Sequence, residues 1–131
     1  MPVRYLLDTN IIIEAVASSQ PAVEALHHAT MSEWVGYSAI TRLEVFGYPD
    51  LSLEEEAALK VVIEEFNEIE VTSSIIDRAI TIRRVKRIKA PDAIIAATAQ
   101  EMRATLITRN ITDFTAIEGL AVVNPWTTPL G

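Results

Sequence analysis

Short apolar runs alternate with longer amphipathic stretches along the whole chain. Runs rich in apolar and β-branched residues predict strands at 3–7, 34–37, 69–72, 105–108 and 120–123. Apolar positions at helical spacing predict helices at 10–17, 22–31, 39–46, 52–66, 73–85 and 92–102. Strands separated by helices are typical of a parallel sheet covered on both faces. We therefore expect a three-layer α/β fold, with four or five short parallel strands, in a single domain of residues 1–131.

Residues that commonly begin helices stand at the expected boundaries. Thr9, Ser38 and Ser52 are suitable N-caps, because a hydroxyl can accept a hydrogen bond from a free N–H of the first turn. Pro91 fits the first turn of the last long helix, where proline has no hydrogen-bonded N–H to lose. The helix before it should bury one stripe, formed by Ile75, Ala79, Ile82 and Val85.

The composition narrows the class of protein. With 131 residues, half of them hydrophobic, the chain can bury the core of one domain. It has neither an apolar stretch that could span a membrane nor a signal-peptide pattern, so we expect a soluble, cytoplasmic protein. Cysteine is absent, which leaves oxygen and histidine as metal ligands. His27 and His28 would point in different directions on a helix, so we expect surface positions for both.

The charges are segregated along the chain. The net charge of −7 argues against simple electrostatic adhesion to nucleic acid. Seven of the 18 acidic residues lie between positions 54 and 70, whereas six of the 11 basic residues lie between positions 78 and 89. The basic segment has two interpretations: a solvated face or salt-bridge partner of the acidic helix, or a track for nucleic-acid phosphates. The second interpretation predicts phosphate contacts by Arg84, Arg87 and Lys89.

Four acidic residues occupy positions where a solvated carboxylate is unexpected. Asp8 lies between the first strand and an apolar helix, and Asp92 lies in the first turn of a helix that is apolar on nearly every side. Glu44 shares a helical stripe with Leu43, and Asp113 follows the fourth strand in a polar loop. Three of them also have an ordinary explanation. Asp92 could complement a helix N-terminus, Glu44 could pair with a nearby base, and Asp113 could be a turn residue.

Taken together, the four acids predict a metal site. The carboxyl ends of parallel strands meet at one edge of the sheet, where ligands commonly bind. Two carboxylates about 4 Å apart repel by on the order of 4 kcal/mol at an effective dielectric constant of 20. Several converging acids therefore need protons, arginines or a divalent cation. Oxygen ligands of this kind suit Mg²⁺ or Mn²⁺ rather than zinc.

Four segments also carry a resemblance to a known family. They are Leu6–Asn10 (LLDTN), Ser38–Gly47 (SAITRLEVFG), Lys89–Thr98 (KAPDAIIAAT) and Leu106–Phe114 (LITRNITDF). In this order and spacing they resemble the signature blocks of the PIN domain, in particular of the VapC-type ribonuclease toxins of toxin–antitoxin systems. The segment Val122–Trp126 is similar too. No single block is specific, whereas the four in order are, and they extend over essentially the whole chain.

The resemblance implies a metal-dependent endoribonuclease that hydrolyses RNA with Mg²⁺ or Mn²⁺ as its cofactor. Asp8, Glu44 and Asp92 match the first three acids of the family. The supporting polar positions fall on Thr9, Asn10, Thr108 and Asn110. The resemblance further implies a homodimer and a small antitoxin partner that covers the acidic cleft.

One position departs from the family pattern. Many members have an aspartate where this chain has Asn110. Either Asp113 supplies the fourth acid through a turn of helix that curls the loop back, or Asn110 serves as a neutral ligand. We favour Asp113, because a carboxylate binds a hard cation better than an amide does and because Phe114 can anchor the turn. The predicted catalytic and metal-binding set is therefore Asp8, Glu44, Asp92 and Asp113.

Two other functions are compatible with parts of the pattern. A PIN-like domain without turnover would act as an RNA- or protein-binding module. A phosphoacceptor receiver domain is also an α/β fold with acids at strand ends. It is less consistent with this chain, because Asp8 has no adjacent acid pair and no lysine follows a later strand.

Overall fold

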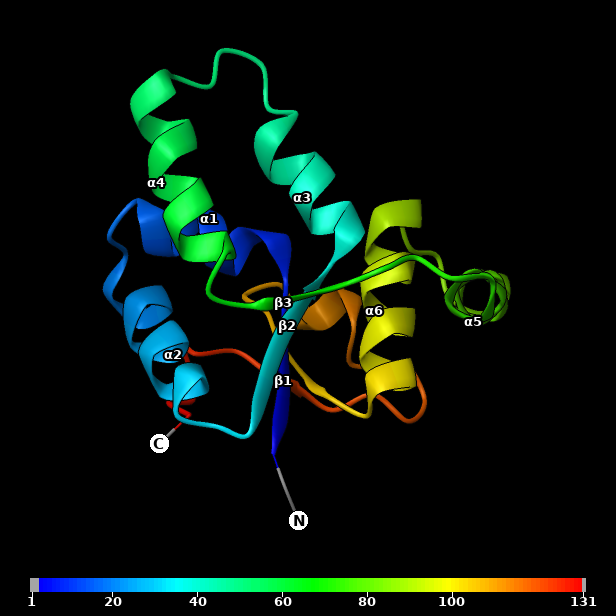
Figure 1. Cartoon of the computed structure of the whole chain (residues 1–131). Helices are drawn as coiled ribbons and strands as arrows, with labels where there is room; N and C mark the ends of the chain where they lie inside the picture. The colour runs from blue at the N-terminus through cyan, green and yellow to red at the C-terminus, as the bar shows by residue number, and fades with distance from the viewer. Residues whose placement is uncertain (1–2, 131) are drawn as a thin grey trace.

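The structure, a computed structural model, describes residues 3–130. In this part of the chain five strands form one parallel sheet in the order β3-β2-β1-β4-β5 (Figure 1). The strands are β1 (Arg4–Leu7), β2 (Trp34–Ser38), β3 (Asn67–Ile69), β4 (Thr105–Ile107) and β5 (Val122–Val123). The predicted α/β fold with a parallel sheet of short strands is confirmed.

Helices connect all consecutive strands. They are α1 (Thr9–Val16), α2 (Gln20–Thr30), α3 (Ala39–Phe46), α4 (Leu53–Ile63), α5 (Ser73–Val85) and α6 (Ala90–Met102), with a 3₁₀ helix η1 (Ile111–Asp113). Ser38 and Ser52 cap α3 and α4 as predicted. Thr9 is not a cap, because the carboxylate of Asp8 accepts from the Thr9 N–H and caps α1 instead. No helix within residues 3–130 is long and apolar enough to cross a membrane.

Consecutive residues of the central strands point to opposite faces of the sheet. Leu6 and Leu106 are paired across β1 and β4 and lie in a core shared with α5 and α6. Leu7 and Ile107 are the next pair and lie in a second core, shared with α1 to α4. All four side chains are fully buried. The two apolar faces explain why these strands are continuous apolar runs rather than alternating patterns.

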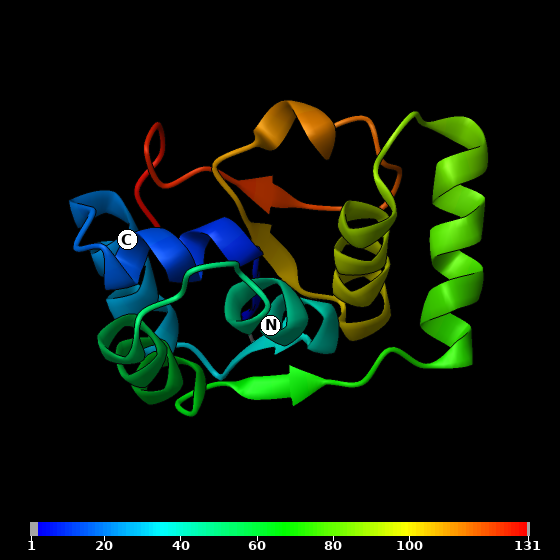
Figure 2. The same cartoon turned by 90° about the horizontal axis from the view of Figure 1, so that it is seen from above.

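The helices are unevenly stacked on the two faces. On one side α6 covers the sheet and α5 packs outside it, whereas α1, α2 and α4 lie on the other side (Figures 1 and 2). Three members of the predicted α5 stripe are buried, but Val85 is 84% exposed. The prediction was wrong at Val85 because α5 ends there and the next residue, Lys86, is extended.

The element boundaries that differ most from the sequence prediction are the end of the third strand and the end of the fourth helix. The third strand is formed by residues 67–69 rather than 69–72, because Asn67 joins the sheet and its side chain donates to the Val35 carbonyl oxygen (3.0 Å). Thr72 instead caps α5. The fourth helix ends at Ile63 rather than at Phe66. Phe66 is still buried, but it lies in the turn that follows the helix.

Candidate active site

The carboxyl edge of the sheet gathers the four predicted acids. Asp8 follows β1 directly, and α3, which carries Glu44, follows β2 without a gap. A two-residue connection joins α6 to β4, so α6 runs back against the strands and its first turn, with Asp92, lies at the same edge (Figure 1). Asp113 ends η1, a few residues after β4. The topology thus places all four acids at one end of the molecule.

Asp8 is a buried carboxylate with two hydrogen-bond donors. Its side chain is 5% exposed. One oxygen accepts from the Thr9 N–H (2.8 Å) and the other from the Thr108 hydroxyl (2.7 Å). Burial raises the pKa of Asp8 to about 6; the Thr108 hydrogen bond opposes this rise, and the negative charges of Asp92 and Glu44 add to it. At neutral pH an ionised Asp8 is therefore held at an electrostatic cost that a cation would relieve.

Thr9 also orients Glu44. The Thr9 hydroxyl lies 2.7 Å from Glu44 Oε1 and 3.0 Å from the Thr41 hydroxyl. A hydroxyl has one proton to donate, so Thr9 donates to the carboxylate and accepts from Thr41. Thr41 is fully buried and was not predicted. The sequence signal was its position one turn before Val45, on the packed side of α3.

The surroundings of Glu44 correct two expectations from the sequence. Leu43 is 65% exposed, so the packed face of α3 is not the stripe that Leu43 and Glu44 share. The nearest base in sequence, Arg42, pairs with Glu68 of β3 (2.6 Å), not with Glu44. The ordinary explanation of Glu44 as half of a local ion pair is therefore wrong.

Asp92 and Asp113 are each partly buried and close enough to influence one another. Burial raises the pKa of Asp92, and the charges of Glu44 and Asp113 raise it further, whereas Lys89 lowers it. These charge interactions link the two acids with Glu44 in one electrostatic cluster. Asp8 joins the same cluster through its interactions with Asp92 and Glu44.

The loop after β4 contains both candidates for the fourth acid. The Asn110 side-chain amide donates to the Asp113 carboxylate, and the Asn110 N–H donates to the Thr108 hydroxyl oxygen (3.0 Å). Phe114 is 1% exposed and anchors the turn in the core, as expected. Asn110 thus holds Asp113 in this structure. That Asp113 is the metal ligand stays a prediction.

Asn10, one of the predicted supporting residues, is not hydrogen-bonded to the four acids in residues 3–130. It is exposed, and within the described chain its side chain makes no hydrogen bond to any of the four. It lines a separate hollow of about 510 Å³ between α1, α3 and α4, together with Ile13 and Tyr48.

Basic side chains lie directly beside the acids. Arg83, Arg87 and Lys89 line a hollow of about 400 Å³ together with Asp92 and Asp113. Arg83 was not predicted; its Nε donates to the Ile88 carbonyl oxygen (3.1 Å), which turns this side chain back toward the segment after α5.

The third predicted phosphate-binding residue, Arg84, lines an adjoining hollow with Lys86 instead. Among residues 3–130 the ion pair made by the basic segment is that of Arg78 with Glu101 of α6. In this part of the chain, the basic segment therefore forms no salt bridge to the acidic helix α4.

The chemical nature of the candidate ligand atoms suits a hard divalent cation. All four candidate ligands are carboxylates, which Mg²⁺ and Mn²⁺ prefer. Burial, and after it the negative charges of neighbouring acids, raise the pKa values of Asp8 and Asp92. In residues 3–130 no three acidic or histidine side chains are gathered tightly enough to surround a metal ion. Asp8, Glu44 and Asp113 are instead each engaged by a hydroxyl or amide donor.

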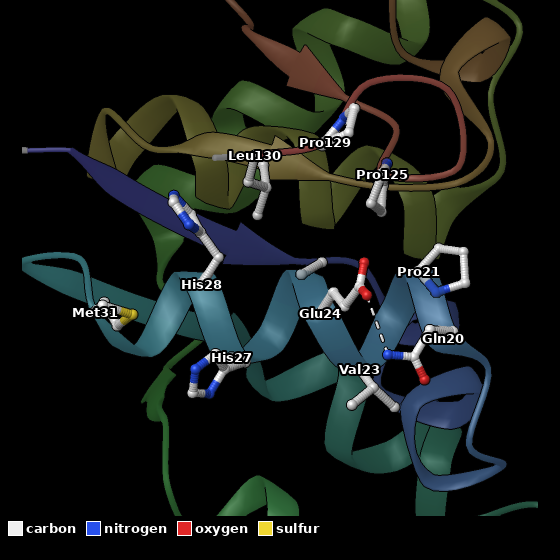
Figure 3. A pocket seen from close by; sticks show the side chains of 11 residues that line it. Gln20, Pro21, Val23, Glu24, His27, His28, Met31, Pro125, Pro129 and Leu130 are labelled. Carbon is white, nitrogen blue, oxygen red and sulfur yellow. Dashed lines mark hydrogen bonds between the residues drawn. The ribbon is translucent and has the colours of Figure 1, made fainter.

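A hollow of about 660 Å³ between α2 and the segment 125–130 contains the two histidines (Figure 3). His28 points toward that segment and His27 points away from it, so the two rings do not form a pair (Figure 3). Glu24, on the same helix, accepts a hydrogen bond from Gln20 (3.1 Å). The residues that line this hollow include none of the four acids.

Comparisons with known proteins found one family model and several similar solved structures. The sequence profile of the PIN domain matches residues 5–120. A toxin–antitoxin complex from Klebsiella pneumoniae contains a chain 36% identical to this one, with a TM-score of 0.78 over 92% of this chain and 97% of that chain. FitAcB from Neisseria gonorrhoeae is 29% identical, with a TM-score of 0.78 over 95% and 99%. VapBC2 from Rickettsia felis, bound to a promoter DNA fragment, shares the fold at 22% identity, with a TM-score of 0.81 over 93% and 98%. No curated protein matches the chain.

Proposed function

The chain belongs to the PIN domain family, and from this premise we propose that it is a metal-dependent endoribonuclease and the toxin of a toxin–antitoxin pair. One observation carries the proposal. Asp8, Glu44 and Asp92 converge at the carboxyl edge of the sheet, close enough for the charges of Glu44 and Asp92 to raise the pKa of Asp8. Converging carboxylates need protons or a cation to coexist, and a bound divalent cation would meet that need.

The residues that would hold Mg²⁺ or Mn²⁺ are Asp8, Glu44 and Asp92, with Asp113 as the fourth. A bound ion would stabilise the charge that develops on the phosphate and would make a water molecule more acidic. Each carboxylate oxygen of Asp8 accepts one hydrogen bond from the protein, and a second lone pair on each oxygen is free for a ligand. The hydrogen bonds of this chain are thus compatible with ion binding.

Two threonines orient the acids before any ligand arrives. Thr9 donates its N–H to Asp8 and its hydroxyl to Glu44. Thr108 donates its hydroxyl to Asp8 and accepts from Asn110, whose side chain holds Asp113. Side chains fixed in this way lose little freedom when substrate binds, which is a general requirement of an efficient site.

The basic hollow is our proposed contact for the RNA chain. Arg87 and Lys89 lie beside Asp92, so a phosphate chain that reached the acids would pass over both. Their positive charges would offset, close to the site, the repulsion expected from a net charge of −7. Arg84 would contribute from the adjoining hollow.

We further propose a homodimer and a small antitoxin partner. The relative from Klebsiella pneumoniae is part of a toxin–antitoxin complex. Large apolar side chains on and after α3 support a protein partner near Glu44, because Leu43, Tyr48 and Leu53 are at least 65% exposed. Co-purification with the product of a small neighbouring gene, and light scattering of the isolated chain, would test the two proposals separately.

The ribonuclease proposal is tested by metal-dependent cleavage. Purified protein should cleave single-stranded RNA in Mn²⁺ or Mg²⁺, stop in EDTA and recover when metal is restored. Asp92→Asn should abolish cleavage, whereas Asp77→Asn, which removes an exposed carboxylate from α5, should leave it unchanged. Full activity in EDTA would contradict the metal mechanism.

A PIN-like binding module without turnover is the alternative. The observation that favours it is that the acids of residues 3–130 are not drawn together into a metal-binding group. RNA binding without cleavage, in the presence of bound Mn²⁺, would support this alternative over the nuclease.

A further inference from the structure

Arg109 stands between the two residues that hold the aspartates, Thr108 and Asn110. Its Nη1 lies 2.9 Å and 3.2 Å from the two carboxylate oxygens of Glu14 in α1. Its guanidinium carbon lies 4.5 Å from the centre of the Trp126 ring, a cation–π distance. The Arg109 side chain thus joins α1 to the segment that follows β5.

The backbone of the same loop is tied to that segment as well. The Thr108 N–H donates to the Val123 carbonyl oxygen (3.0 Å). The Arg109 carbonyl oxygen accepts from the side-chain amide of Asn124 (3.1 Å), which is 9% exposed. The oxygen of that amide accepts from the backbone N–H of Trp126 (2.9 Å), so Asn124 ties the loop to the backbone of the segment that carries the indole.

We propose that Arg109 is a positioning residue of the active site. By pairing with Glu14 and Trp126, Arg109 fixes the position of this loop. Its neighbours in the loop, Thr108 and Asn110, in turn orient Asp8 and Asp113. The proposal rests on the ribonuclease function proposed above. It adds to that function a residue whose side chain forms no hydrogen bond with the four predicted metal ligands within residues 3–130.

The geometry explains why this position matters more than an ordinary surface ion pair. Glu14 belongs to the helix that begins with Thr9, the donor to Asp8 and Glu44. Arg109 therefore connects the two elements that donate the hydrogen bonds to the Asp8 carboxylate. An exposed ion pair contributes little to global stability, so the loss of Arg109 should disturb the loop more than the fold.

The first test compares Arg109→Ala with Arg42→Ala. Arg42 pairs with Glu68, and the side-chain exposures of this pair, 58% and 30%, match the 54% and 30% of the Arg109–Glu14 pair. With RNA cleavage measured at saturating Mn²⁺, Arg109→Ala should lower kcat at least tenfold with KM within twofold of wild type. Arg42→Ala should change neither, and the melting temperatures of the two variants should be alike.

The conservative variant Arg109→Lys separates positioning from folding. An ammonium can still pair with Glu14 and lie over Trp126, so kcat should recover part of the loss. Equal kcat values for Arg109→Ala and Arg42→Ala would overturn the proposal.

A second readout does not depend on cleavage. The amides of Asn110 and Asp113 both donate hydrogen bonds within the loop, and their hydrogen exchange can be followed by NMR. In Arg109→Ala these amides should exchange at least tenfold faster than in wild type, with no change in Arg42→Ala. If the wild-type protein cleaves no RNA, the ribonuclease proposal fails. The role of Arg109 in holding the loop is then tested by the exchange rates alone. Unchanged exchange would overturn that role whether or not RNA is cleaved.

Discussion

Replacing Asp8 by Asn removes a buried negative charge while preserving the local hydrogen bonds. The asparagine oxygen can accept from the Thr9 N–H, and asparagine is itself a favourable N-cap. The new amide can donate to the Thr108 hydroxyl oxygen, in place of the hydrogen bond that this hydroxyl donates to Asp8 in the wild type. The variant therefore isolates the electrostatic contribution of the carboxylate.

The size of that contribution follows from the pKa of Asp8, which is raised from 3.8 to about 6. A shift of about two units corresponds to about 3 kcal/mol. Because the folded-state pKa is the higher one, the folded protein binds the proton more tightly than the unfolded chain does. Stability is thus lost as pH rises from about 4 to about 6, and the loss persists above that range.

Asparagine does not ionise and escapes this loss. Above pH 7 and without metal, Asp8→Asn should be more stable than wild type by up to about 3 kcal/mol, or roughly 10 °C in melting temperature. As pH falls toward 4 the advantage should shrink, and well below pH 3.8 it should vanish, since Asp8 is then protonated in both the folded and the unfolded state. The same variant should cleave no RNA.

Urea unfolding in EDTA at pH 4.5 and pH 7.5 measures the effect, with Asp77→Asn as the control that should show no pH-dependent difference. Added Mn²⁺ should stabilise wild type and not the variant, because it binds only the folded site. If Asp8→Asn were markedly less stable than wild type at pH 7.5 in EDTA, Asp8 would be a structural partner. The assignment of the site would then be wrong.

Two further predictions concern the loop after β4 and the basic hollow. Asp113→Asn should lower cleavage at least tenfold and Asn110→Ala less, with Mn²⁺ affinity measured alongside; a silent Asp113→Asn would show that our choice of fourth acid is wrong. Arg87→Ala combined with Lys89→Ala should weaken RNA binding and reduce the slope of log affinity against log salt by about 1–2. The matched pair Arg84→Ala and Lys86→Ala, in the adjoining hollow, should have a smaller effect. A slope unchanged from wild type in the Arg87→Ala, Lys89→Ala variant would leave the basic segment as a solvated face.

The sequence predicted those parts of the site that depend only on residues close to one another along the chain. An acid directly after an apolar strand, as at Asp8, must lie at the end of that strand. The turn through Ile111 and Thr112 follows from a short polar loop that ends in a core phenylalanine, Phe114, and the structure contains this turn.

The parts that the sequence did not predict depend on contacts between distant segments. The Thr41 hydroxyl matters because Thr9, 32 residues away, lies opposite it. Arg83 lines the basic hollow because the chain reverses after α5, which places the Ile88 carbonyl oxygen where it accepts a hydrogen bond from the Arg83 side chain. The third strand was misplaced for a similar reason, since its limits are set by pairing with β2 rather than by its own apolar residues.

The central position of β1 has a consequence for how the protein is made. β1 is synthesised before both of its neighbours, β2 and β4, and Asp8 receives its Thr108 hydrogen bond across 100 residues of sequence. Pairing over such a separation is slow to form, and until it forms β1 keeps one unpaired edge. A growing chain that has not yet reached residue 108 therefore lacks a complete acidic site. The proposed ribonuclease activity would therefore begin only after the loop that follows β4 has been synthesised.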